Sequence, residues 1–146
     1  MEEIKRLEEN LLLVRRVVGW SAECLGEKIG VTRQTINNIE NHRSKLTKTQ
    51  YIAIRCVLDA EIEQSPNDTQ MLKSFLEIFV DNPEKYSDED KQILLEKANL
   101  LAPAILAGTA TREAVSKEWV NTLKTMSIVV LGSIVWGWMS KIMKHL

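Results

Sequence analysis

Residues 21–41, with the sequence SAECLGEKIGVTRQTINNIEN, constrain the fold of this chain more than any other stretch. Ser21 and Thr32 stand where the N-caps of two successive short helices are expected. Gly30 occupies a tight turn between these helices, and Gly26 is small where the helices must approach each other. The apolar residues have helical spacing and would face a common core: Leu25, Ile29, Val31, Ile36 and Ile39. The segment therefore predicts two short helices packed against each other across a tight turn.

The remaining sequence is also predicted to be helical, which makes the fold class all-α. A first helix ends at Gly19, and another begins at Thr47 after a polar loop. The turn-forming sequence SPND at residues 65–68 interrupts the pattern. We therefore expect one domain over residues 1–64 and a separate helical region over residues 68–146.

The C-terminal region has its own helix signals. Ser87 and Asp90 resemble a capping pair at the start of a helix, and Pro103 must end or kink that helix. A last helix is predicted from about Arg112 to the end of the chain.

Charge is distributed unevenly along the sequence. The whole chain has a net charge of −1. Residues 10–56 contain eight basic and three acidic side chains, whereas the rest of the chain is acidic. A basic segment within an acidic chain favours a polyanionic partner for that segment alone.

Residues 10–58 resemble the DNA-binding domain of the phage repressor, Cro and Xre family. The resemblance covers about a third of the chain and implies a lambda-repressor-like helix-turn-helix bundle. The matching residues are Arg15, Gly19, Ser21, Glu23, Leu25, Gly26, Ile29, Gly30, Val31, Thr32, Gln34, Ile36, Glu40 and Asn41.

The resemblance implies that the second helix of the motif enters the major groove of DNA. Arginine can bind the two acceptors of guanine, and glutamine or asparagine can bind adenine through paired hydrogen bonds. The expected base-reading residues are Arg33, Gln34, Thr35, Asn37 and Asn38.

Phosphate contacts are expected at the helix N-termini and in the loop after the recognition helix. Arg15 and Glu40 match a structural ion pair of the family. Ala22 departs from the family, which often has a glutamine there that binds phosphate and supports the base-reading amide. The expected phosphate-binding residues are Ser21, Thr32, Asn41, Arg43 and Lys45.

These features predict a sequence-specific transcriptional regulator, by family habit a repressor, that binds double-stranded DNA as a homodimer or higher oligomer. The alternative is a helix-turn-helix module used for protein docking in a membrane-linked scaffold or assembly protein. The sequence contains no motif typical of an enzyme, and we expect neither a cofactor nor a metal. The acidic, amphipathic start is unlike a secretory signal, so a cytoplasmic protein is expected.

Residues 125–140 form an uncharged apolar stretch between Lys124 and Lys141. As a helix it would span about 24 Å, against roughly 30 Å of bilayer hydrocarbon. Trp136 and Trp138 suit a membrane interface, and Ser133 with Gly137 forms a small-xxx-small pair. Three interpretations remain open: a membrane anchor that tethers the protein to the cytoplasmic membrane, a helix buried in an oligomer, or a core helix of the monomer.

Overall fold

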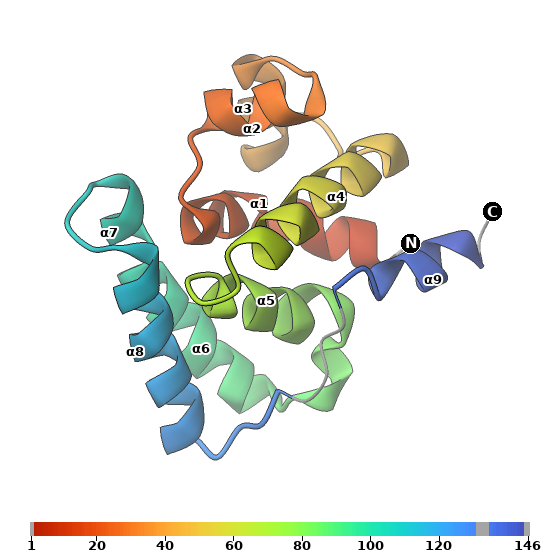
Figure 1. Ribbon diagram of the computed structural model, residues 1–146. Helices are drawn as coiled ribbons and strands as arrows, with labels where there is room; N and C mark the ends of the chain where they lie inside the picture. Colours follow the sequence, from red (N-terminus) through yellow and green to blue (C-terminus); the bar gives the residue numbers. More distant parts are fainter. Residues whose placement is uncertain (1, 131–134, 145–146) are drawn as a thin grey trace.

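The computed structural model describes residues 2–130 and 135–144, and every regular element in these two ranges is helical (Figure 1). The all-α fold class is therefore confirmed. The α-helices are α1 (Glu2–Val18), α2 (Ala22–Ile29), α3 (Arg33–Glu40), α4 (Lys48–Gln64), α5 (Gln70–Leu76), α6 (Asp88–Leu101), α7 (Pro103–Leu106), α8 (Arg112–Thr125) and α9 (Trp138–Met143). A π-helical turn, η1 (Glu77–Asp81), continues α5, and a 3-10 turn, η2 (Pro83–Lys85), follows it.

Local capping chemistry fixes where the N-terminal helices begin and end. The Ser21 side chain accepts a hydrogen bond from the Cys24 amide, and the Thr32 side chain accepts one from the Thr35 amide. Thr47 forms a full capping box with Gln50 at the start of α4. Each of these caps satisfies amides that a helix start leaves without a partner, so the predicted starts of α2, α3 and α4 are confirmed.

Two glycines set the geometry of the turns. Gly19 and Gly30 have φ values of 80°, the left-handed conformation that ends α1 and α2. Gly26 lies within α2, where an added Cβ would be only 2.6 Å from the carbonyl oxygen of Val31. The close approach inferred from the sequence is confirmed, because any side chain at this position would collide with the backbone of the turn.

Helix α1 is the central element of the molecule. It packs against α3 and α4 on the N-terminal side and against α5, η1, α6 and α7 on the C-terminal side. Its buried side chains follow helical spacing and include Leu7, Leu11, Val14 and Val18. The buried apolar side chains of both halves form one continuous cluster. The division at residues 65–68 stays a prediction, and the two regions that it separates share a core.

Polar contacts also join the two halves. The Arg112 guanidinium at the start of α8 lies 3.3 Å from a carboxylate oxygen of Glu61 and 3.1 Å from one of Asp68. It also donates a hydrogen bond of 3.1 Å to the carbonyl oxygen of Val18. One side chain therefore links α8 to the ends of α1 and α4.

The prediction of one long helix at the C-terminus is wrong. Helix α8 ends at Thr125, and Ser127 has a φ of 58°. The Ile128 amide then donates a hydrogen bond of 2.9 Å to the carbonyl oxygen of Leu123. This left-handed residue and the hydrogen bond across five residues close the helix, and the β-branched run at residues 128–130 follows in non-helical conformation.

The expected helix over residues 125–140 is replaced, among the described residues, by this turn and by the short α9. Ser133 lies outside the described residues. Within residues 2–130 and 135–144, no helix combines the length and apolar character needed to cross a bilayer.

Trp136 and Trp138 were expected to face a membrane or another chain, but they pack on α4 of their own chain. Trp138 is buried and its indole N–H donates a hydrogen bond to Asp59. The Trp136 indole donates to Glu63 over 2.6 Å, and Gly137 between the two tryptophans is exposed. The C-terminal segment thus follows the monomer-core interpretation where the structure describes it.

Candidate nucleic-acid interface

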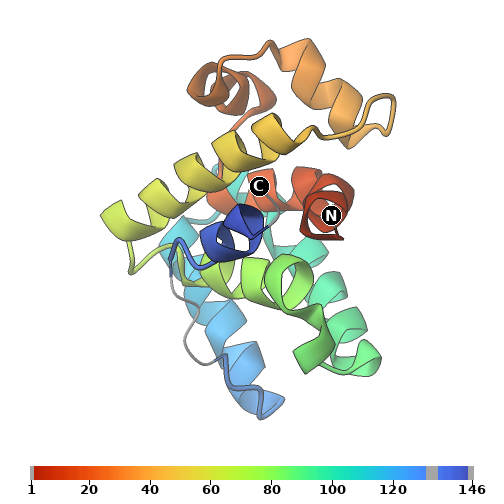
Figure 2. The same cartoon turned by 90° about the vertical axis from the view of Figure 1, so that its right-hand side faces the viewer.

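Helices α2 and α3 lie together at one end of the molecule, remote from α8 in both views (Figures 1 and 2). Ile36 and Ile39 turn inward from α3 and are fully buried. This burial fixes the rotation of α3 about its axis. Arg33 and Gln34 consequently lie exposed on the opposite face, and Thr35, Asn37 and Asn38 are partly exposed.

Two side-chain hydrogen bonds organise this exposed face of α3. The Gln34 side-chain amide donates to the Asn38 side-chain oxygen over 2.9 Å. The hydroxyls of Thr32 and Thr35 lie 3.1 Å apart, within hydrogen-bonding distance of each other. Asn38 therefore holds the side-chain amide of Gln34 from one helical turn further along α3. Ala22, the position at which the sequence departs from the family, is buried.

The expected phosphate-binding residues occupy two kinds of position. Ser21 and Thr32 are exposed N-caps, where amides at the start of a helix favour an anion. Asn41, Arg43 and Lys45 are exposed on the loop between α3 and α4. The structure thus brings side chains from both helix starts and from the following loop to the end of the molecule that contains α3.

The loop after α3 is held by its backbone. The amides of Arg43 and Ser44 both donate to the carbonyl oxygen of Asn38, at 2.8 and 3.2 Å. His42 has a φ of 61°, which turns the chain back on the helix end. At the far side of the loop, the Leu46 amide donates to the Glu8 carboxylate over 2.6 Å. The backbone that carries Arg43 and Lys45 is therefore fixed at both ends.

Arg15 and Glu40 form a bidentate ion pair beneath this surface. The Arg15 Nε lies 2.7 Å from one carboxylate oxygen of Glu40, and Nη2 lies 3.0 Å from the other. Arg15 Nη1 also donates to the carbonyl oxygen of Trp20 over 3.0 Å. The pair joins α1 to the C-terminal end of α3 and to the turn before α2.

A second buried polar cluster was missed by the sequence reasoning. Arg55 on α4 is buried and forms a bidentate ion pair with Asp81, at 2.6 and 3.0 Å. Its guanidinium also lies over the rings of Tyr51 and Trp138. Burial is the main cause that raises the pKa of Tyr51 to about 12. The cluster joins α4 to η1 and to the C-terminal segment, so its role is structural.

One signal in the sequence could have indicated this cluster. Arg55 falls among Tyr51, Ile54 and Leu58, in the helical turn that faces the core. A charged residue in such a position needs a buried partner. The identity of that partner, 26 residues away in the chain, has no local signature.

The comparison with protein families gives a match over the N-terminal part of the chain. Residues 14–64 match the model of a family described as helix-turn-helix. Neither the curated proteins nor the solved structures gave a match. The family match supports a DNA-binding regulator, and this family is regulatory rather than enzymatic. Residues 14–64 thus form a helix-turn-helix of the Xre and lambda-repressor type.

Proposed function

We propose that this protein is a sequence-specific transcriptional regulator that inserts α3 into the major groove of double-stranded DNA. The observation that carries the proposal is the exposed polar face of α3, where Arg33 and the paired Gln34 and Asn38 lie opposite the buried Ile36 and Ile39. Arginine and amide side chains are those that distinguish guanine and adenine in the major groove. Thr35 and Asn37 complete the reading surface.

Contacts with the DNA backbone would hold α3 in register with the bases. Ser21 and Thr32 would bind phosphate at the two helix starts, and Asn41, Arg43 and Lys45 would do so from the loop. A single short recognition helix presents few base contacts. We therefore propose a homodimer on a palindromic site, with half-sites about one helical turn apart, roughly 34 Å. We propose that the protein represses transcription by blocking polymerase, and that it does so in the cytoplasm.

The base-reading assignment is tested with Arg33→Ala and Gln34→Ala. A site selected from random oligonucleotides and an unrelated duplex are compared by fluorescence anisotropy at fixed salt. Each substitution should weaken binding to the selected site by about 5- to 150-fold, the equivalent of roughly 1–3 kcal/mol, and change binding to the unrelated duplex much less. Gln64→Ala, an exposed glutamine at the end of α4, is the matched control.

Equal losses of affinity for both duplexes would show that these side chains contact the DNA backbone instead of the bases. Failure to select any site would favour a protein-docking module. For the phosphate assignment, Lys45→Ala should weaken binding to every duplex and reduce the slope of log K against log salt by about one unit.

A further inference from the structure

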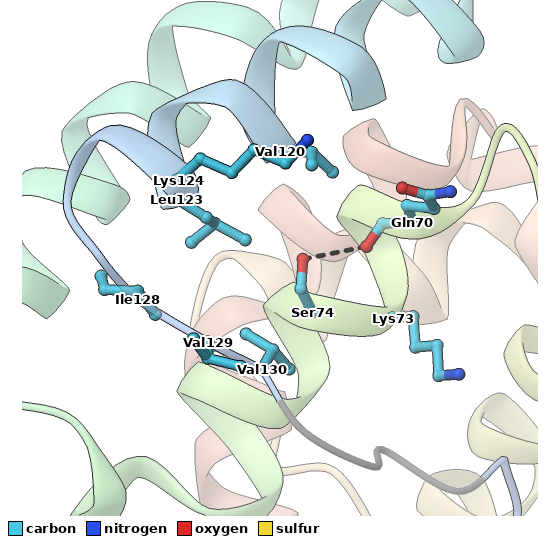
Figure 3. Close-up of a pocket in the computed structure, with 9 residues that line it drawn as sticks. All are labelled: Gln70, Lys73, Ser74, Val120, Leu123, Lys124, Ile128, Val129 and Val130. Atoms are coloured by element: carbon cyan, nitrogen blue, oxygen red, sulfur yellow. Dashed lines mark hydrogen bonds between the residues drawn. The ribbon is translucent and has the colours of Figure 1, made fainter.

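A pocket of about 320 Å³ lies between α5, α8 and the segment that follows α8 (Figure 3). Its walls include Val120 and Leu123 from α8 and three successive residues, Ile128, Val129 and Val130. Figure 3 shows Leu123 directed into this space, with the segment 128–130 along one side. The volume is at the lower end of the range for small-molecule sites, so it suits a short apolar chain.

The floor of the pocket offers little hydrogen bonding to a ligand. Ser74 is its buried polar residue, but its hydroxyl already accepts from the Trp119 indole over 2.7 Å and lies 2.9 Å from the carbonyl oxygen of Gln70 as a donor. A hydroxyl has one proton to donate, so Ser74 is satisfied within the protein. The floor therefore acts as an apolar surface.

Polar recognition is confined to the rim, and its charge is positive. Lys124, Lys73 and Gln70 line the pocket, and none of the described residues that line it carries a carboxylate. Lys124 extends from α8 in the direction of α5 (Figure 3). Among the described residues Lys124 has no ion-pair partner, whereas Lys117 on the same helix lies 3.4 Å from Glu113. Lys73 also lines a smaller cavity together with Asp59 and Asp81, so Lys124 is the lysine of the rim that is farther from these carboxylates and better suited to an anion.

We propose that this pocket binds a small amphipathic carboxylate, a medium-chain fatty acid or a molecule of similar shape. The apolar chain would lie against Val120, Leu123 and the residues 128–130, and the carboxylate would bind Lys124 beside the Gln70 amide. Val129 is 68% exposed at the rim, and such a ligand would cover it. This site is separate in space from the proposed DNA-binding surface, which lies at the other end of the molecule (Figure 1).

The test is calorimetric titration of the full chain with octanoate. We expect saturable binding of one octanoate per chain, and binding of octan-1-ol at least tenfold weaker because the alcohol lacks the charge. Lys124→Gln should weaken octanoate binding about fivefold or more. Lys117→Gln is the matched control and should leave the affinity unchanged.

A second pair of variants tests the location of the site without disturbing the core. Val129→Glu places a negative charge at the exposed rim and should weaken octanoate binding about tenfold, whereas Val129→Gln should bind nearly as well as the wild type. The proposal is overturned by an absence of saturable binding, by equal affinity for octan-1-ol, or by equal losses in Lys124→Gln and Lys117→Gln. Sedimentation with phosphatidylglycerol vesicles but no saturable octanoate binding would also overturn it, in favour of a lipid surface.

Discussion

Arg15 joins three parts of the N-terminal half through one guanidinium group. Its ion pair with Glu40 is largely buried, with side-chain exposures of 10% and 5%. Removing one partner of such a pair leaves the other charge without compensation in a poorly solvated position. We expect Arg15→Ala to lower the free energy of unfolding by about 3 kcal/mol, measured by urea denaturation.

A matched variant separates loss of the ion pair from loss of surface charge. Arg43→Ala also removes one positive charge, but from an exposed loop position, and should change stability by less than about 0.5 kcal/mol. Equal destabilisation by the two substitutions would contradict the structural role of Arg15.

Asp59 should make stability depend on pH. Burial is the main cause that raises its pKa above 3.8, against the opposing effects of the Trp138 indole and of Arg55. The folded state therefore binds this proton more tightly than the unfolded state does. The contribution of Asp59 to the free energy of unfolding is fully present below about pH 3.8. It is lost as the pH rises through the raised pKa that Asp59 has in the folded state.

The variant Asp59→Asn isolates this effect, because asparagine retains an oxygen that can accept from Trp138 and does not titrate. We expect the wild type to lose stability relative to Asp59→Asn as the pH rises from 3.5 to 7, in urea denaturation at each pH. A difference that stays constant over this range would show that burial does not raise the pKa of Asp59.

The packing of α2 against the turn before α3 depends on a close backbone contact at Gly26. A Cβ added there would meet a carbonyl oxygen of the turn, and this backbone atom cannot move aside as a side chain could by changing rotamer. We expect Gly26→Ala to destabilise the protein by about 1–3 kcal/mol and to weaken DNA binding, because α3 would be displaced from α2. Thermal unfolding and fluorescence anisotropy measure the two effects.

Gly108→Ala is the control for the backbone. Gly108 has a φ of 75°, but an added Cβ there meets nothing within 4 Å. This substitution should cost about 1 kcal/mol through backbone strain and leave DNA affinity unchanged. An equal loss of DNA affinity in both variants would show that the effect is not specific to the α2–α3 contact.

The elements that the sequence predicted well are those fixed by local chemistry. Ser21, Thr32, Thr47 and Ser87 cap helices through amides three residues away, so the relevant atoms are close in the sequence. The candidate DNA surface could be proposed from the sequence for the same reason, because its residues belong to α3, to the N-caps of α2 and α3, and to the loop that follows α3.

The C-terminal segment could not be predicted in this way. An apolar run has the same composition whether it crosses a membrane, covers another chain or returns to its own core. The contacts that distinguish these outcomes join Trp138 to Asp59 and Lys141 to the carbonyl oxygen of Asp81, which are 79 and 60 residues apart. Neither partner has a local signal, and the turn that follows the end of α8 depends on a left-handed residue, Ser127, that is not glycine.

At the scale of the whole molecule, the shared core predicts cooperative unfolding. Helix α1 packs on elements from both sides of residues 65–68, and Arg112 bonds to the ends of both α1 and α4. Removing either half would expose the apolar face of α1 that the other half covers, at a cost that scales with the area exposed. Neither half should therefore unfold while the other stays native.

The four tryptophan indoles show directly whether the two halves unfold together. Trp20 lies at the start of the helix-turn-helix, and Trp119, Trp136 and Trp138 lie in the C-terminal region. In two-dimensional ¹⁵N–¹H spectra recorded across a urea series, their native side-chain signals should disappear with one common midpoint. A lower midpoint for Trp119, Trp136 and Trp138 than for Trp20 would indicate two independently stable domains, with the boundary that the sequence predicts at residues 65–68. A common midpoint would mean that whatever binds the C-terminal region also stabilises the helix-turn-helix, because both would belong to one folding unit.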